Sequence, residues 1–208
     1  FLSLLRDARN NLSKEAYEKY LAAATSLYEK DQDEYLRKAI EANYAKFQGN
    51  QMYHGNTELS LDKAVDVIRY FAASSQVTNL YKVKLMKLMW YADALAYKKR
   101  GTAITGLVYQ ALPMGAVPIG HNSIIDLKNV PCEEVDMGET NAYHFSLNGE
   151  QSFPALSEEE KNILDSVIEK LGRMSKTEII NFMHKEKAYI STAPRDVIQF
   201  QYAESLQI

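Results

Sequence analysis

A long helix that is apolar around most of its circumference constrains the fold of this chain more than any other feature. It is predicted over residues 79–99, where Thr78 can cap the first turn and Gly101 can end the last. At about 100° per residue, the apolar residues cover one face and continue around the side: Leu85, Leu88, Met89, Ala92 and Ala96, then Val83, Met86, Trp90 and Tyr97. Such a helix must be surrounded by other elements, so we expect it at the centre of the hydrophobic core.

A carboxylate, Asp93, falls inside the buried arc of this helix. A buried carboxylate needs hydrogen bonds or a cation. We expect Asp93 to accept hydrogen bonds from neighbouring backbone or from a tyrosine hydroxyl. An acid–base role is the alternative, but the helix supplies no histidine and no second carboxylate to complete a pair.

A narrow strip of the same helix carries basic and aromatic residues: Lys84, Lys87, Tyr91 and Lys98. Surfaces that bind nucleic acids mix these residue types. A solvent-exposed face of an amphipathic helix explains the strip equally well, and we expect it to be exposed.

The N-terminal quarter is predicted to be helical. Ser13 can cap a first helix, whose apolar residues recur at helical spacing: Tyr17, Tyr20, Leu21, Ala24, Leu27 and Tyr28. A second apolar repeat begins near Tyr35, and the two together suggest a helical hairpin packed on the main domain or on a partner. A recognition helix is the alternative. Residues 48–58 have the glycine- and amide-rich composition of a linker. We therefore divide the chain into residues 1–50, a helical extension or linker that follows a missing N-terminal region, and a domain over 59–208.

The remainder alternates helices with short β-hairpins. Ser60 can cap a helix near 61–73, and two capping boxes, Ser157 with Glu160 and Ser175 with Glu178, predict helices near 158–171 and 176–186. Changes of period predict a strand or hairpin in 102–112, a hairpin in 133–149 with Gly-Glu-Thr-Asn at its turn, and a last helical turn after an extended piece in 193–208. The predicted fold class is mainly α (α+β). We expect a helical domain around a central buried helix, with one or two small β-hairpins and the N-terminal helical extension.

The stretch YQALPMGAVPIGHNSI, residues 109–124, follows the long helix and is rich in glycine and proline. It lacks the lysine and hydroxyl residue of a phosphate-binding loop. Pro113 and Pro118 fix the backbone, while Gly115 and Gly120 permit unusual dihedral angles. The sequence therefore predicts a rigid structural turn, followed by a short helix, that can serve as a platform for a partner.

Catalytic and metal-binding patterns are missing from the sequence. The best local pairs, His121 with Asp126 and His184 with Glu186, lack the spacing of a metal motif. Cys132, the single cysteine, is followed by two glutamates that disfavour its thiolate. We expect no cofactor, no metal and no enzymatic activity.

Net charge and hydropathy limit the classes of partner. The chain has 24 basic and 27 acidic residues, a net charge of −3, whereas nucleic-acid binding needs a concentrated basic face. We find no apolar run long enough to cross a membrane and no signal peptide. The lone cysteine fits a reducing compartment, so we expect a cytoplasmic protein.

Two stretches of the chain carry a resemblance to a known family. The residues are KLMKLMWYADALAYKKRGTAITGLVYQALPMGAVP, from Lys84 to Pro118, and the C-terminal HKEKAYISTAPRDVIQFQYAESL. In this order and spacing they resemble the Panacea, or SocA-like, antitoxin domain, whose pattern reads KLxKLLYYAD, a glycine turn, a tyrosine-containing strand, Y-G-P-V-P and a C-terminal histidine and aromatic residue. Ala116 stands where the family usually has proline, and Tyr189 where tryptophan is common.

The resemblance implies a bacterial or phage antitoxin that neutralises a cognate protein toxin, encoded beside it, by direct contact. A DNA-binding transcriptional autoregulator and a proteolytic adaptor for the toxin are the alternatives. Such domains often follow an N-terminal accessory domain, so DNA contact through a missing region and a homo-oligomer stay open; no membrane partner is expected. The residues expected to contact the partner are Lys84, Lys87, Tyr91, Lys98, Pro113, Met114, Gly115, Val117, Pro118, His121 and Tyr189.

Overall fold

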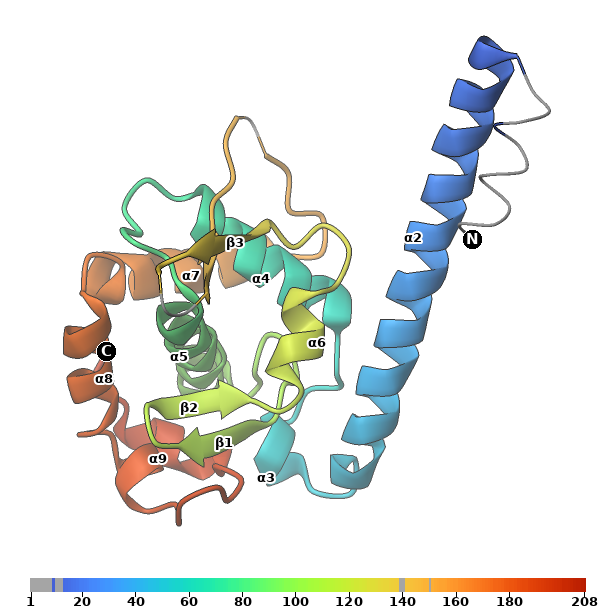
Figure 1. Ribbon diagram of the computed structural model, residues 1–208. Helices are drawn as coiled ribbons and strands as arrows, with labels where there is room; N and C mark the ends of the chain where they lie inside the picture. Colours follow the sequence, from blue (N-terminus) through green and yellow to red (C-terminus); the bar gives the residue numbers. More distant parts are fainter. Residues whose placement is uncertain (1–8, 10–12, 139–140, 150) are drawn as a thin grey trace.

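A computed structural model gives the fold for residue 9 and for residues 13–138, 141–149 and 151–208. A central helix, α5 (Lys82–Arg100), is enclosed by the other elements of the body. Figure 1 shows α5 in the middle, with α4 (Leu61–Ala73) and α7 (Glu158–Leu171) above it and the β1–β2 hairpin below. Helix α8 (Lys176–Met183) closes one side. The predicted mainly α (α+β) class is confirmed.

The central position of α5 follows from its sequence. Leu85, Leu88 and Met89 are at most 1% exposed, and so is Trp90 on the side of the helix. Trp90 packs edge-on against Tyr109, with ring centroids 5.2 Å apart. The prediction that this helix forms the centre of the core is confirmed.

The C-terminal end of α5 agrees with the prediction, and the N-terminal end does not. Gly101 adopts a left-handed conformation at the C-cap, as expected, with φ of 78°. Thr78 does not cap the helix: the N-cap is Tyr81, which makes no side-chain capping bond. The start is displaced because residues before the helix are used elsewhere, since Asn79 takes a positive φ and Tyr81 pairs with His144 of a hairpin.

Two small antiparallel hairpins are present within the described residues. The first pairs β1 (Tyr109–Leu112) with β2 (Gly115–Pro118), and the second pairs β3 (Cys132–Asp136) with β4 (Asn141–Phe145). The first lies further along the chain than predicted, since the second strand belongs to the stretch that we interpreted as a turn. For the second hairpin, Glu139 and Thr140 of the predicted turn lie outside the described residues.

A glycine determines how closely the first hairpin packs on α5. Gly115, which opens β2, has φ of +107°, and a Cβ there would lie 2.8 Å from Cγ of Met183 and 2.9 Å from Cε of Lys87. Only glycine fits both this backbone conformation and this spacing. The hairpin therefore lies directly against α5 and α8.

Capping residues set the boundaries of the C-terminal helices. Ser157 with Glu160 and Ser175 with Glu178 form the two predicted capping boxes at the starts of α7 and α8. Helix α8 ends at Met183, three residues before the predicted end. The last elements are α9 (Lys187–Ile190) and a 3₁₀ helix, η2 (Phe200–Ser205), which follows an extended segment that bonds to β1.

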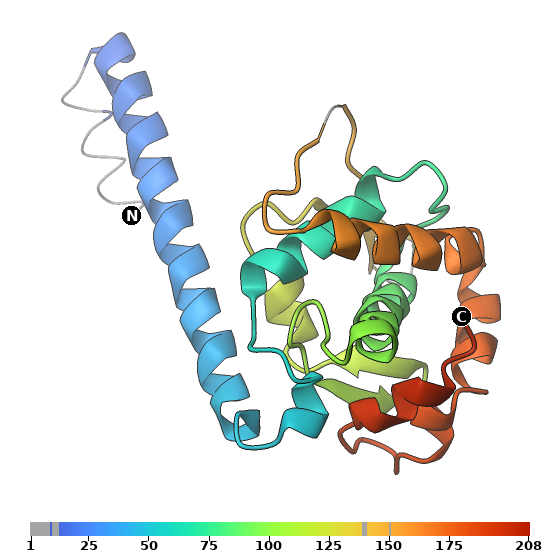
Figure 2. The ribbon, with the colours of Figure 1, turned by 180° about the vertical axis from the view of Figure 1, so that it is seen from behind.

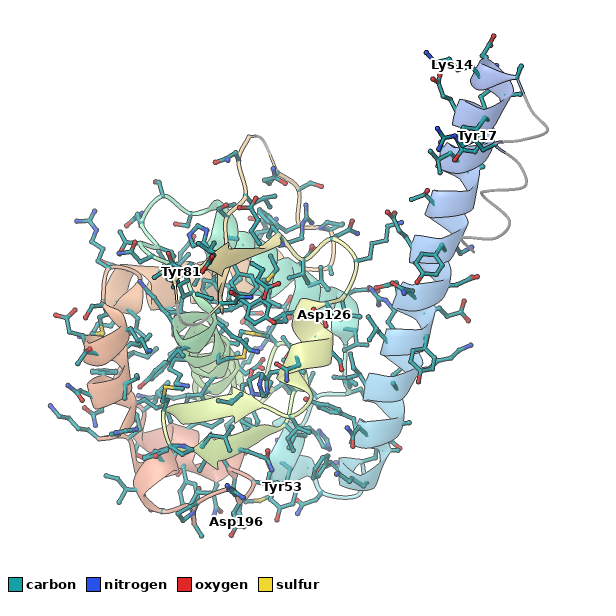
Figure 3. All side chains as sticks on the ribbon, in the orientation of Figure 1. Lys14, Tyr17, Tyr53, Tyr81, Asp126 and Asp196 are labelled. Atoms are coloured by element: carbon teal, nitrogen blue, oxygen red, sulfur yellow. The ribbon has the colours of Figure 1, made fainter. Side chains whose placement is uncertain are left out.

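Among the described residues of the N-terminal extension, one continuous helix replaces the predicted hairpin of two. Helix α2 runs from Lys14 to Tyr44 without a glycine or proline to interrupt it, and Ser13 caps it as expected. Figures 2 and 3 show α2 beside the body, with Lys14 and Tyr17 at the end far from it. The side chains of residues 20, 24 and 27, part of the predicted apolar repeat, lie outside those described.

The opposite end of α2 is packed on the body. Ile40 and Tyr44 are 3% and 4% exposed, and the Tyr44 hydroxyl donates to the Ile119 carbonyl at 2.8 Å. The chain continues through η1 (Ala45–Phe47) and α3 (Gln51–His54). The segment expected to be a linker is thus folded, and Thr57 donates from its hydroxyl to the Ala103 carbonyl. The short helix α6 (His121–Ile125) lies beside α2.

Candidate partner-binding surface

The basic and aromatic strip predicted on the central helix is not a surface. Lys84 and Lys87 are 2% and 1% exposed, and Tyr91 is fully buried. The expectation that these residues are exposed is therefore wrong. The physical reason is that α5 contacts α7, α8, β2 and η2, which together leave no open face along this part of the helix. Lys98 alone is exposed, and its Nζ donates to the Leu206 carbonyl.

Lys84 and Tyr91 have hydrogen-bond partners inside the body. The Lys84 Nζ donates to the carbonyls of Thr78 and Gly172 at 2.5 and 2.6 Å, which ties the start of α5 to the end of α7. Burial lowers the pKa of Lys84 to about 8. The Tyr91 hydroxyl donates to Oε1 of Glu186 at 3.3 Å, and burial raises the pKa of both groups. These two residues hold the fold together.

Lys87 differs from Lys84 in lacking such partners. Its ammonium group makes no hydrogen bond or ion pair with any residue that the structure describes. Burial lowers its pKa to about 8. The pKa of His121 is lowered by burial and by the nearby charges of Lys82 and Lys87. A buried cation without acceptors reduces the stability of the folded state.

Asp93 takes the structural role predicted for it. Its two carboxylate oxygens accept hydrogen bonds from the backbone N–H of Ile104 and Thr105, from the Thr105 hydroxyl and from the Tyr109 hydroxyl, at 2.5–2.8 Å. Burial raises the pKa of Asp93, and these four donors oppose the shift. The carboxylate fixes the turn between α5 and β1, which is the segment that leads into the first hairpin.

The glycine- and proline-rich stretch of residues 109–124, predicted to be a structural turn, lies partly in the core and partly at the surface. Gly115, Val117 and Pro118 are buried in strand β2, so the expectation that they are exposed is wrong. Pro113 and Met114 form the hairpin turn and are exposed, Met114 by 46%. Strand β2 is buried because it packs against α5 and α8. The turn projects beyond them.

A stacked pair of rings supports this turn. His184 and Tyr189 lie with ring centroids 4.5 Å apart and planes within 14° of parallel. His184 Nε2 lies 3.2 Å from the Pro113 carbonyl, and the Tyr189 hydroxyl donates to the Leu112 carbonyl at 3.1 Å. The pair anchors the β1–β2 turn to α9. His121, at the far end of the hairpin, instead lies with Nδ1 3.3 Å from the Pro118 carbonyl.

These contacts join two segments into one surface, which we call the hairpin–α9 surface. We define it by Pro113 and Met114 from the turn and His184, Tyr189 and Ile190 from the region of α9. Ile190 is 68% exposed, the most of any apolar residue in this region. Sequence reasoning missed Ile190. It placed His184 in a weak metal pair and in the C-terminal part of the family motif, but not among the partner-contact residues. For Ile190, the available signal was its position directly after Tyr189, the aromatic residue of the family motif.

The structure offers little for metal or nucleophilic chemistry. Among the described residues, no group of three or more His, Cys, Asp or Glu side chains is arranged to hold a metal ion. Burial raises the pKa of Cys132, and Asp126 and the adjacent glutamates add to the shift. No helix within the described ranges is both long and apolar enough to cross a membrane.

A comparison with protein families matches residues 85–189 to the family described as antitoxin SocA-like, Panacea domain. This stretch is just over half of the 208 residues, so the chain belongs to that family. Membership supports, in general terms, an antitoxin role in a toxin–antitoxin system, with a toxin as partner and without catalysis. No curated protein and no solved structure gives a significant match. The match lies inside residues 59–208, and the predicted domain boundaries themselves stay a prediction.

Proposed function

We propose that this protein neutralises a cognate protein toxin by binding it directly through the hairpin–α9 surface. The family supports a toxin as partner. The observation that carries the choice of surface is the joining of exposed Met114 and Ile190 to a rigid support by the His184–Tyr189 stack. Of the partner-contact residues predicted from the sequence, Pro113, Met114 and Tyr189 are retained in this proposal.

The chemistry of this surface suits protein recognition. Protein interfaces combine an apolar centre with polar surroundings, and aromatic residues and methionine are enriched in them. Methionine adapts its shape to a partner at low cost. The hydrogen bonds of His184 and Tyr189 to the hairpin backbone fix the surface before binding, which limits the entropy lost on association. Lys84, Lys87 and Tyr91 are not part of the proposal, because the fold buries them.

Growth rescue tests the proposal. The toxin gene adjacent to this one is co-expressed with the full chain, and with Met114→Asp, Ile190→Asp and the control Met137→Asp. Met137 lies between β3 and β4 and is 60% exposed, a value between those of Met114 and Ile190, so the control introduces the same charge at an exposed apolar residue elsewhere. The full chain and the control should rescue growth and co-purify with the toxin. The two surface variants should do neither while keeping the circular dichroism spectrum of the full chain.

The possible outcomes test the antitoxin function and the choice of binding surface separately. If the unmodified chain neither rescues growth nor co-purifies with the toxin, the antitoxin proposal is wrong. If all variants rescue growth equally, the toxin binds elsewhere. Toxin abundance distinguishes a proteolytic adaptor, because direct inhibition leaves the toxin in a stoichiometric complex whereas an adaptor removes it. Gel-shift assays with the promoter of the operon test the remaining alternative, the DNA-binding autoregulator.

A further inference from the structure

A buried lysine amine lies next to the hairpin–α9 surface. The side chain of Lys87 passes between strand β2 and helix α8, which both lie beside α5 in Figure 1. A Cβ placed on Gly115 would lie 2.9 Å from Lys87 Cε and 2.8 Å from Cγ of Met183. Gly115 directly follows Met114, and Met183 directly precedes His184. Standard bond lengths and the spacing of consecutive Cα atoms therefore place the Lys87 Nζ within about 10 Å of the Met114 Cα.

The Lys87 amine keeps contact with solvent although the residue is only 1% exposed. Among the described residues, the polar side-chain atoms that are both shielded from solvent and without a hydrogen-bond partner are Nδ1 of His54 and Nε1 of Trp90. The Lys87 Nζ also lacks a partner within the described part of the chain, so it is not shielded. Because so little of the residue is accessible, the opening above Nζ is narrow.

The described residues supply no negative charge to Lys87. Burial lowers its pKa, and no carboxylate of these residues opposes that shift. At Lys84, Glu178 does oppose the shift, and two backbone carbonyls accept hydrogen bonds from the ammonium group. The pKa of His121 is lowered by burial and then by the charges of Lys82 and Lys87, so the positive field of Lys87 reaches beyond its own side chain. An anionic group at the opening would meet an unpaired cation.

An anion at Lys87 must bring further contacts with it. A single charge-assisted hydrogen bond contributes less free energy than even millimolar binding requires, so a free carboxylate ion would not stay bound. Nucleic acid is disfavoured by the net charge of −3, because its phosphates attract a concentrated basic face. A protein supplies both an acidic side chain and apolar contacts, and exposed Met114 and Ile190 lie in the adjoining surface. The anion that fits is therefore a carboxylate of a protein partner.

We propose that the toxin bound at the hairpin–α9 surface inserts an aspartate or glutamate side chain whose carboxylate pairs with Lys87. The carboxylate accepts a charge-assisted hydrogen bond from the ammonium group and gives the buried charge the partner that it lacks. Because this pairing rests on the proposed function, it specifies the contact region of the toxin as an acidic side chain surrounded by apolar ones. Lys87 then reduces the stability of the free protein and strengthens the complex.

Calorimetric titration with the toxin encoded by the adjacent gene tests this pairing on the full chain. Lys87→Met should bind the toxin more weakly by about tenfold or more, because the toxin carboxylate is left buried without its partner. Lys99→Met removes an exposed lysine of the same helix and should bind normally. Lys87→Met should also unfold at a higher urea concentration at pH 7 than the unmodified chain, since the cost of burying the charge is removed. A lysine with only a structural role would lose stability and affinity together.

Substitutions in the toxin identify the acidic residue. Each exposed aspartate of the toxin is changed to asparagine and each exposed glutamate to glutamine. One of these changes should weaken binding to the unmodified chain by about tenfold or more. The same change should have little further effect on binding to Lys87→Met, because both substitutions remove one and the same contact.

The results distinguish the pairing from the proposed function. If the unmodified chain does not bind the toxin, both are wrong. If it binds, and Lys87→Met binds as tightly as Lys99→Met, only the pairing is wrong. Toxin substitutions that all act equally on the unmodified chain and on Lys87→Met would likewise overturn the pairing. Circular dichroism checks the fold of Lys87→Met, and a variant that does not fold would show that the fold itself needs the Lys87 charge, which contradicts the pairing.

Discussion

Asp93 and Lys87 are buried charged residues six positions apart on α5, and they differ in the number of hydrogen-bond partners around them. Asp93 is fully buried but receives four donors, two of them backbone amides that no other residue satisfies. Lys87 is 1% exposed and has no acceptor within the described residues. Hydrogen bonds to the charged form partly offset the cost of burial at Asp93, whereas Lys87 makes no such bonds with the described residues and burial lowers its pKa.

This contrast predicts the pH dependence of a lysine variant. In the folded protein the pKa of Lys87 is about 8, against 10.5 for an ordinary lysine. Below pH 8 both states carry the charge, so the folded state bears the full cost. Between pH 8 and 10.5 the unfolded chain binds more protons, and stability rises with pH. Lys87→Met should therefore be more stable than the unmodified protein at pH 7, by up to about 3 kcal/mol at ~1.4 kcal/mol per pKa unit.

Urea unfolding of the two proteins at several pH values measures this difference. The advantage of Lys87→Met should shrink steadily above pH 8 and vanish near pH 10.5. Comparing the two proteins removes the contributions of tyrosines and of Cys132, which titrate in both. A variant less stable than the original at pH 7, or a difference that does not change with pH, would mean that Lys87 is satisfied in solution by groups or water that compensate its burial.

At the scale of elements, α5 carries the fold because other elements pack around its whole circumference. Leu88 is fully buried on the face predicted to be the centre of the core. Leu88→Ala should lower the free energy of unfolding by ~2–5 kcal/mol, the usual range for a buried leucine. Ile190→Ala in α9 is the control: Ile190 is 68% exposed, so its change should be below about 0.5 kcal/mol. Chemical denaturation measures both, and a loss at Leu88 below about 1 kcal/mol would show that this face is loosely packed.

The elements that the sequence predicted well are those marked by local chemistry. Ser60, Ser157 and Ser175 cap α4, α7 and α8 as expected, because capping bonds form within a few residues. The hairpin after α5 was misplaced because strand β2 is short and starts at Gly115, whose conformation is determined by contact with Met183 and Lys87. The local pattern of the amino-acid sequence does not indicate such a contact between segments that are distant in the chain.

The candidate site was predictable only in part for a related reason. Met114 and Tyr189 could be predicted from the sequence, because Met114 lies in a glycine- and proline-rich turn and Tyr189 is the aromatic residue of the family motif. Lys84 and Lys87 were expected to be exposed, since lysine is rarely buried. For Lys84, the acceptors that permit burial include the Gly172 carbonyl, 88 positions away in the chain. The sequence also did not predict a cavity that is lined by residues of α2, α3 and the loop before β1, because only the fold brings these segments together.

At the scale of the whole molecule, the last turns of α2 and the body of the protein share one core. Ile40 and Tyr44 of α2 belong to the same buried cluster as α5, and Gly55 accepts a hydrogen bond from the Ala103 backbone. Arg37 adds an ion pair to Asp62 of α4 at 2.8 Å. We therefore expect the last turns of α2 to unfold together with the domain.

Tyr44→Ala tests this coupling, with Tyr35→Ala as a control on the same helix. Tyr44 is 4% exposed and Tyr35 74%. Tyr44→Ala should lower the free energy of unfolding by ~3–5 kcal/mol, as for other buried aromatic residues, because it removes the ring and leaves the Ile119 carbonyl without its donor. Tyr35→Ala should change it by less than about 0.5 kcal/mol. Amide hydrogen exchange locates the effect: if the junction belongs to one cooperative unit, Tyr44→Ala should speed exchange in α5 as well as in α2. If exchange in α5 is unchanged while α2 alone opens, the extension is a separate unit, and the core ends at the start of α4.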